Sequence, residues 1–277
     1  MRASRLRQLH GESDGSQVLR RCMDSIGSGR DHASMCGRYV TPDEAAMERA
    51  YNLTARQWEA WMDEAYRPSY NVAPSQRVPV LRVIRQVGGE RRIDPMRWGL
   101  IPFFARGEPP KYSTINAMIE KLDVAPAWRG PWRRGQRCVM PAAGFYEWQV
   151  QPDGAKQPYY IQPAGDGEVF SIAALWDRSR TESGEDVLSC AIITMPANEL
   201  LSEIHNAKQR MPLILPPEAV DTWLTGTPEQ ATALLVPYPS ELMRTHRVSK
   251  RVNAPRNDDP ELMAPVEPDN GQQALQL

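Results

Sequence analysis

Hydrophobic residues in the middle of the chain come in short runs separated by turn-forming residues. Such runs, rich in β-branched and aliphatic side chains, are typical of strands rather than of long helices. The pattern therefore predicts a mainly antiparallel sheet that curls into a barrel-like core. The expected strands are residues 78–84, 94–100, 137–141, 159–161, 169–175 and 187–194.

Helices are expected at a few places around this sheet. Thr41 has the position of an N-cap, and Glu44 completes a capping box, for a first helix that runs to about Leu53. Pro217 suits a first helical turn and Gly226 a helix stop. The expected later helices are residues 116–122, 198–204 and 217–224. The predicted fold class is therefore α+β, with curved, mainly antiparallel sheets forming a barrel-like core and peripheral helices.

The two ends of the chain differ in composition from the middle. Residues 1–34 are rich in Arg and Ser and lack the apolar core of a secretory signal. We interpret them as a disordered extension, either a misassigned start or a propeptide. From residue 257 onward Pro, Asp and Gln are frequent, so this end is expected to fray. We assign residues 35–266 to a single domain and 267–277 to a flexible tail.

The composition narrows the function classes. With 277 residues, of which 41% are hydrophobic and 24% charged, the chain can bury a substantial core. A net charge of -1 argues against a uniformly basic nucleic-acid binder, so a DNA-binding surface has to be local. Four cysteines without a CxxC pair indicate neither a zinc site nor a disulfide framework. We expect no metal, no cofactor and, since no apolar run is long enough to span a bilayer, no membrane partner.

Cys36 follows a methionine, and this position gives it a possible chemical role. If Met35 is the true or processed start, Cys36 gains a free α-amine beside its thiol. Such an aminothiol attacks an aldehyde through nitrogen to give a Schiff base and then closes through sulfur to a thiazolidine. An α-amine titrates at about 7.7 to 8.0, so a useful fraction is neutral in the cell. The alternative is an ordinary buried packing cysteine.

Two further side chains could move protons. Glu147 stands between Tyr146 and Trp148 at the end of an apolar stretch, where burial would raise its pKa and suit it to proton transfer. A solvated surface position is equally consistent with this segment. His205 follows a predicted helix and is the best placed of four histidines, although a structural hydrogen bond is the commoner role.

Several other residues have both a functional and a structural interpretation. Asn116 is either a site amide or a helix N-cap. Trp98 and Pro74 lie in aromatic, turn-forming segments and serve either as a platform and wedge for an unstacked base or as core and loop packing. Arg38 and Arg210 are candidates for phosphate contacts or ordinary surface residues.

Seven motifs occur in a specific order along the chain. Each is weak alone, but together they are specific. They are MCGRY (35–39), YNVAP (70–74), WGLIP (98–102), INA (115–117), PAAGFYEW (141–148), RMP (210–212) and VSKRVN (248–253). On these motifs, residues 35–266 resemble the SOS response-associated peptidase family, also described as abasic-site processing proteins.

The resemblance implies a catalytic domain of the fold class given above. Its partner would be single-stranded DNA, or a junction of single and double strands, that carries an abasic site. The terminal cysteine would crosslink to the ring-opened sugar aldehyde as a thiazolidine, a lyase-like activity in the DNA damage response. We expect a monomer that is cytoplasmic and, if bacterial, associated with the nucleoid.

The resemblance also assigns roles residue by residue. Cys36 would be the nucleophile, Asn116 would position its amine and the sugar, Glu147 would shuttle protons, and His205 would polarise or protonate the sugar oxygen. Arg38 and Arg210 would hold phosphates, and Trp148 would line the site. The predicted DNA-binding set is Arg38, Asn71, Pro74, Trp98, Trp148 and Arg210.

Three departures from the family pattern are visible. Met118 stands where members usually have Arg, two residues after the site asparagine. Four residues separate His205 from Arg210, where members often have one, and Lys208 in this longer loop could supply positive charge. Residues 1–34 precede the nucleophile, and an internal cysteine has no free amine.

Two other functions are consistent with the residues. The first is a thiol peptidase in which Cys36 and His205 form a nucleophile and base pair that removes the chain's own extension. The second is a noncovalent DNA-binding module whose terminal cysteine never matures.

Overall fold

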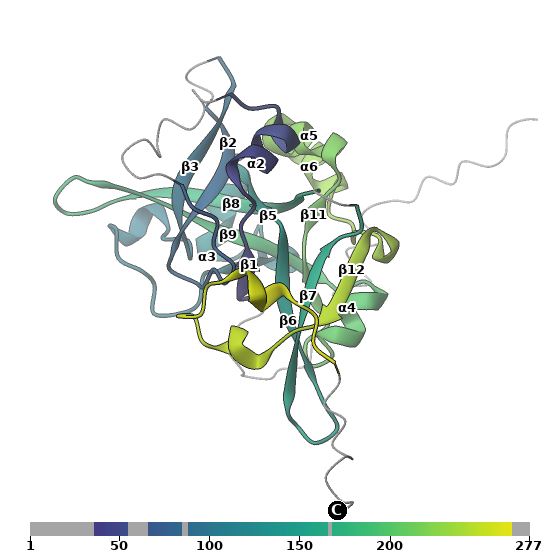
Figure 1. The fold of residues 1–277 in the computed structure, drawn as a ribbon. Coiled ribbons are helices and arrows are strands. Elements are labelled where there is room, and N and C mark those ends of the chain that lie inside the picture. The colour runs from purple at the N-terminus through teal and green to yellow at the C-terminus, as the bar shows by residue number, and fades with distance from the viewer. Residues whose placement is uncertain (1–35, 55–65, 85–87, 166–167, 268–277) are drawn as a thin grey trace, which may run out of the picture. The chain divides into compact units, whose positions relative to one another are not determined.

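The larger sheet of the structure closes on itself as a barrel (Figure 1). The computed structural model describes residues 36–54, 66–84, 88–165 and 168–267, so the predicted extension and tail lie almost wholly outside the described residues. In ring order the strands are β3 (Glu90–Trp98), β2 (Arg77–Ile84), β5 (Arg137–Ala142), β8 (Phe170–Arg180) and β9 (Asp186–Pro196). Neighbouring strands in this ring are antiparallel, except that β9 and β3 are parallel where they close it. The expected barrel-like core is confirmed.

Strand β9 is long enough to change partners along its length. On one edge β3 gives way to the parallel strand β4, and on the other β8 gives way to the antiparallel strand β10. Thr194 of β9 therefore has Met118 on one side and Pro212 on the other. The short strands are β4 (Asn116–Met118), β10 (Arg210–Pro212) and β11 (Ile214–Leu215), the last paired with β8.

A second, four-stranded sheet continues from the barrel. The chain passes from β5 to β6 with only Ala143 between them. Gly144 opens β6, and a Cβ there would lie 2.5 Å from the carbonyl oxygen of Ile161, so only glycine fits this crossing. The strands in order are β1 (Arg38–Val40), β6 (Gly144–Val150), β7 (Lys156–Pro163) and β12 (Met243–Arg247).

Burial in the core explains why several barrel strands appear in the sequence as runs of apolar residues. Leu81, Ile93 and Val139 are each fully buried, as expected when both faces of a strand pack. Trp98 is also fully buried, with its indole nitrogen donating to the carbonyl of Ile115 at 3.1 Å and its ring edge-on to another aromatic. Within the described residues no helix is long and apolar enough to cross a bilayer.

The first helix begins two residues later than its sequence predicts. The N-cap of α2 (Glu44–Tyr51) is Asp43, whose carboxylate accepts from the backbone of Ala46 at 2.7 Å. Thr41, the expected cap, instead accepts from the backbone of Ser69 at 2.8 Å. The predicted capping box is therefore wrong. Thr41 and Asp43 are both residue types that cap helices, but Thr41 binds the backbone of Ser69 and only Asp43 caps the helix.

The other predicted helices have mixed outcomes. The helix expected at 198–204 is confirmed as α4 (Glu199–Ile204), with Asn198 as its N-cap. Gly226 follows α5 (Val220–Thr225), as expected. The helix expected at 116–122 is wrong, because β9 offers a free edge there and Asn116 enters a strand instead of capping a helix. The remaining helices are α3 (Pro126–Arg133), α6 (Pro228–Ala233), and the 3-10 turns η3 (Phe103–Ala105), η4 (Ile119–Lys121), η5 (Pro217–Ala219), η6 (Ser240–Leu242), η7 (Lys250–Asn253) and η8 (Pro260–Met263).

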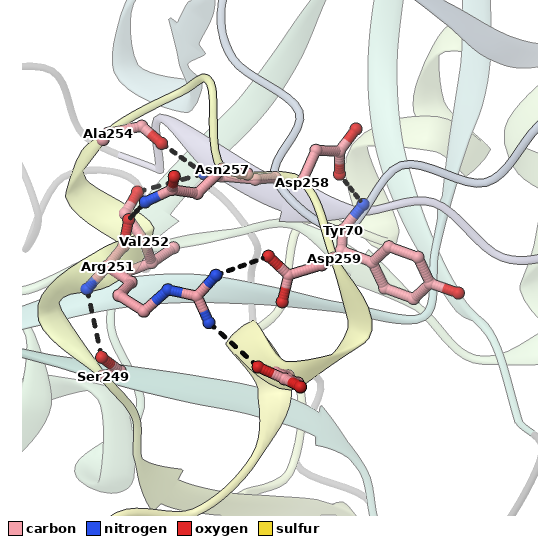
Figure 2. A network of polar contacts seen from close by, with 10 residues as sticks. Tyr70, Ser249, Arg251, Val252, Ala254, Asn257, Asp258 and Asp259 are labelled. Carbon is pink, nitrogen blue, oxygen red and sulfur yellow. Dashed lines mark hydrogen bonds and ion pairs between the residues drawn. The ribbon is translucent and has the colours of Figure 1, made fainter.

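Residues 248–267, which we call the C-terminal strap, fold over the second sheet. Figure 2 shows Arg251 paired with Asp259 inside the strap, and Asp258 accepting from the backbone of Tyr70 outside it. Leu262 is fully buried in the small apolar cluster beneath. The prediction that this end frays is therefore wrong for residues 257–267. The composition does not reveal that Leu262 is buried or that the strap makes several backbone hydrogen bonds.

Leu262→Ala tests whether the strap belongs to the cooperative fold. We expect a loss of about 2 to 5 kcal/mol in the free energy of unfolding, since a fully buried leucine leaves a cavity. Urea denaturation followed by circular dichroism measures it. Val266→Ala, at a position 39% exposed, is the matched control and should change little. A Leu262→Ala protein as stable as this control would contradict an integral strap.

Candidate active site

Cys36 lies immediately before β1 with its nitrogen directed at a carboxylate. It adopts φ of 41°, the left-handed region, and is only 4% exposed. Its backbone nitrogen donates to Oε1 of Glu147 at 3.0 Å. The backbone that leads into β1 therefore directs this nitrogen at a side chain of β6.

Glu147 is a buried carboxyl group. It is 2% exposed, so the surface interpretation is wrong. Burial raises the pKa of Glu147, and the nearby His205, the contacts with Cys36 and the charge of Lys208 oppose this shift only in part. A carboxyl group with a raised pKa, in contact with a possible nucleophile, is suited to accept and return a proton.

His205 ends helix α4 with both ring nitrogens facing polar atoms. Nδ1 lies 3.0 Å from the carbonyl oxygen of Arg210. A carbonyl only accepts, so Nδ1 carries a hydrogen and donates it. Nε2 lies 3.8 Å from Oε2 of Glu147. At this distance the two groups interact electrostatically, which lowers the pKa of Glu147, but they are too far apart for a direct hydrogen bond.

The thiol of Cys36 is held in its neutral form. Burial raises the pKa of this thiol well above its ordinary value, and the Glu147 carboxylate raises it further. The charge of Arg210 opposes the shift. The sulfur is therefore not an activated thiolate of the kind that cysteine peptidases use.

Arg210 is buried close to this group and is strongly paired. Its Nη1 and Nη2 donate to the two carboxylate oxygens of Glu120 at 2.6 and 3.0 Å, and Nη2 also donates to the carbonyl of Thr194 at 2.8 Å. Among the described residues its Nε is buried without a hydrogen-bond partner. This Nε–H is therefore a buried donor that no described residue uses.

Asn116 reaches the same region from the other edge of β9. Strand β4 sets it opposite Ile192, two residues before Thr194, and it is half-buried. Asn116 and Arg210 therefore come from strands on opposite edges of one β9 segment. Asn116 and Arg210 are far apart in the sequence.

Arg38 and Asn71 join the start of β1 to the C-terminal strap. Nη1 of Arg38 donates to Oδ1 of Asn71 at 2.9 Å and to the carbonyl of Val252 at 2.8 Å. The Asn71 amide, 1% exposed, donates to three strap carbonyls, those of Val252, Ala254 and Asn257. These two residues hold Cys36's strand in place, whatever else they contact.

The remaining predicted DNA-binding residues differ in exposure. Trp98 is core, which is the structural interpretation, and its ring is not at a surface that a base could reach. Pro74 is partly exposed in the turn before β2, and Trp148 is partly exposed with its indole donating to the Asn253 side chain at 2.8 Å. Glu120 and Asn253 are contacts that sequence reasoning missed, although Asn253 lies inside a motif that it identified.

The sequence and the fold of this chain are similar to those of known proteins. A family model described as SOS response associated peptidase (SRAP) matches residues 35–255. The abasic site processing protein YoqW of Bacillus subtilis (strain 168) is 39% identical over 234 residues, which cover 83% of this chain and 99% of that protein. The abasic site processing protein HMCES of Gallus gallus is 36% identical, covering 84% of this chain and 78% of that protein. A crystal structure of a protein from Bacteroides thetaiotaomicron superposes with a TM-score of 0.68 at 26% identity, covering 84% of this chain and 98% of that one.

The raised pKa of Glu147 predicts a pH-dependent stability. The folded protein holds this proton above the pH at which the unfolded chain releases it, so stability is full below about pH 4.3 and falls as pH rises through the folded pKa. Glu147→Gln removes this term. The free energy of unfolding of the variant, minus that of the unsubstituted protein, should therefore increase between pH 5 and pH 8 in urea titrations. A difference that stays constant with pH would contradict the buried, proton-binding carboxyl group.

Proposed function

Because the chain belongs to the SOS response associated peptidase family, we propose that it processes abasic sites in single-stranded DNA by a covalent thiazolidine crosslink through Cys36. Relatives that it matches over most of its length are named abasic site processing proteins. The observation that carries the crosslinking proposal is the 3.0 Å contact between the Cys36 nitrogen and the buried Glu147 carboxyl group. The active form is the one whose chain begins at Cys36, because only a terminal residue has an amine.

The first half of the reaction joins nitrogen to carbon. Ring opening of the abasic sugar moves the proton of the anomeric hydroxyl to the ring oxygen and frees an aldehyde. The neutral Cys36 amine then adds to the aldehyde carbon, and the resulting carbinolamine loses its hydroxyl as water to give an iminium. Glu147, within hydrogen-bond reach of the nitrogen, relays the proton that nitrogen gives up to the new hydroxyl. Its own carboxyl proton then goes to the departing hydroxyl, which leaves as water, so Glu147 is a carboxylate when the iminium has formed.

The second half joins sulfur to the same carbon. The Cys36 thiol adds to the iminium carbon and releases its proton to Glu147, which leaves a neutral thiazolidine. The balance is one aminothiol and one aldehyde giving one thiazolidine and one water. Since burial keeps the thiol protonated, the amine is the stronger nucleophile in the resting site, and this fixes the order of the two bonds.

His205 is proposed to supply the proton for ring opening. Its Nε2 lies 3.8 Å from Oε2 of Glu147, so we propose that one of these groups takes a proton from the anomeric hydroxyl while the other gives one to the ring oxygen. Asn116, on the facing edge of β9, is proposed to position the amine and the sugar. Both assignments use residues that the fold brings to the same strand from distant parts of the chain.

The residues proposed to contact DNA are either partly exposed or have an N–H donor that is unused within the protein. Trp148 and Pro74 are partly exposed on the second sheet side and are proposed to stack with or wedge against bases. The Nε of Arg210 is proposed to meet a phosphate. Arg38 and Asn71 are proposed to act mainly by holding β1, and Trp98 by packing behind the site.

The family's name includes peptidase activity, which we keep as a second candidate for removal of the preceding residues. A cysteine peptidase needs a base directed at its sulfur. Here the His205 nitrogens face Arg210 and Glu147, and the Cys36 thiol has a raised pKa. These contacts support Glu147, rather than His205, as the group that acts on Cys36.

Cys36→Ala and Cys36→Ser test the crosslink in protein whose chain begins at residue 36. With an oligonucleotide carrying one abasic site, the unsubstituted protein should give a heat-stable shifted band on a denaturing gel. Neither Cys36→Ala nor Cys36→Ser should give this band. Both keep the terminal amine but lack sulfur, so each should form at most a Schiff base that borohydride traps. Binding to the same DNA, measured by anisotropy, should stay within about twofold, roughly 0.4 kcal/mol.

The matched control substrate is an oligonucleotide whose abasic aldehyde has been reduced to the alcohol. It should bind but never crosslink. Absence of a heat-stable band with the unsubstituted protein, despite binding, would reject the covalent proposal and favour a noncovalent DNA-binding module.

The peptidase candidate has a separate test. If Cys36 cleaves its own extension, full-length protein should shorten to a chain beginning at Cys36 over hours, and Cys36→Ala should stay intact. Intact-mass spectrometry follows both. Because the Glu147 contact supports that residue as the active base, His205→Ala should slow this step less than Glu147→Gln. The reverse order would show that His205 acts on the sulfur.

A further inference from the structure

We propose that Glu120 is a positioning residue of this site, which fixes Arg210 and, through it, His205, and which compensates the charge of Arg210 beside Cys36. This inference rests on the proposed function for its role in catalysis. The contacts that carry it belong to the folded protein alone. Glu120 is not among the site residues predicted from the sequence.

The pair of Glu120 with Arg210 is unusually enclosed. Their side chains are 11% and 10% exposed, and both carboxylate oxygens accept from the guanidinium. A two-point contact between planar groups fixes orientation as well as distance, which a single hydrogen bond does not. The position of the Arg210 side chain is therefore set by Glu120 and by the carbonyl of Thr194.

Fixing Arg210 also fixes the ring of His205. The carbonyl of Arg210 accepts from Nδ1 and thereby turns Nε2 toward Glu147. The chain between them is a tight turn in which the His205 carbonyl accepts from Lys208 and Gln209, and Gln209 takes φ of 51°. Loss of the Glu120 contact at the end of this turn would let the ring orientation relax.

The same pair joins the two elements that carry site residues. Glu120 lies in η4, directly after β4 with Asn116, and Arg210 opens β10 after the His205 turn. Strand β9 lies between them and contributes Thr194 to the contact. Glu120 therefore links the Asn116 side of β9 to the His205 side.

Charge is the second consequence. Around Cys36 the acting groups are Glu147 of β6 and Arg210 of β10, and around Glu147 they are His205 and Lys208 of the turn. Arg210 already lowers the pKa of the Cys36 thiol against the effect of burial. Without the Glu120 carboxylate its charge is uncompensated, which favours the thiolate and disfavours the cationic iminium.

The first test uses the full chain and no DNA. The rate of Cys36 alkylation by iodoacetamide is followed from pH 7 to pH 10 by mass spectrometry of the peptide that carries it. Glu120→Gln should move this profile toward lower pH by about 0.5 unit, the direction that an uncompensated Arg210 dictates. Arg210→Gln should move it the other way, and the double variant should lie near the unsubstituted protein.

Three comparisons separate charge from looser packing. Glu120→Asp keeps the charge but breaks the two-point geometry, so its alkylation profile should stay in place. Asp123→Asn removes a carboxylate three residues further on, from an exposed pair with Arg133, and should change nothing. Equal displacement in the Gln and Asp variants would show general opening of the site and would overturn the charge role.

The second test measures catalysis in protein beginning at Cys36, with saturating abasic DNA. Glu120→Gln and Glu120→Asp should each slow single-turnover crosslinking about tenfold, since both misplace Arg210 and His205, while Asp123→Asn should not. Unchanged rates in both Glu120 variants would overturn the positioning role. If even the unsubstituted protein does not crosslink, the proposed function fails, whereas the alkylation profiles still decide the effect of Glu120.

Discussion

A carboxyl group buried between a nitrogen and an imidazole is the constraint on which the rest of this site depends. Placing Glu147 at 2% exposure is unfavourable unless its oxygens have partners. Its two oxygens face the Cys36 nitrogen and His205 Nε2, respectively. The partners compensate the burial only in part, which is why the pKa of Glu147 stays raised. Because of this remaining shift, Glu147 holds a proton to a higher pH than a carboxyl group in water does.

Strand β9 provides the geometry that keeps this arrangement in place. Because its neighbours change along its length, it holds two separate parts of the chain on either side of Thr194. One segment carries Asn116 and Glu120, the other His205 and Arg210. The second sheet supplies Glu147, and the strap fixes β1, the strand after Cys36, through Arg38. The candidate site is therefore made of residues that are distant in sequence.

The sequence predicts the parts of this fold that local pattern determines, and misses those that depend on distant partners. Strands β5, β8 and β9 were predictable because both of their faces are buried over long stretches, which gives nearly continuous apolar runs. Asn116 was not, since a segment with helical character became a strand only because β9 had an open edge. Trp98 had both a core and a surface interpretation, and its burial includes edge-on packing against Tyr39. The motifs and the resemblance predicted Cys36, Glu147 and His205, which the structure brings together. The Glu120 contact with Arg210 spans 90 residues and has no local signal.

The backbone at Cys36 bears on the proposal that the active chain begins at this residue. At φ of 41° an internal residue other than glycine lies in the left-handed region, which costs about 1 to 2 kcal/mol. In this conformation the backbone N–H is directed at Glu147. A residue that begins a chain has no preceding peptide group and therefore no φ, so its nitrogen can face Glu147 without this cost. The contact with Glu147 is thus strained in an internal cysteine and unstrained in a terminal one, which is the form that the proposed thiazolidine requires.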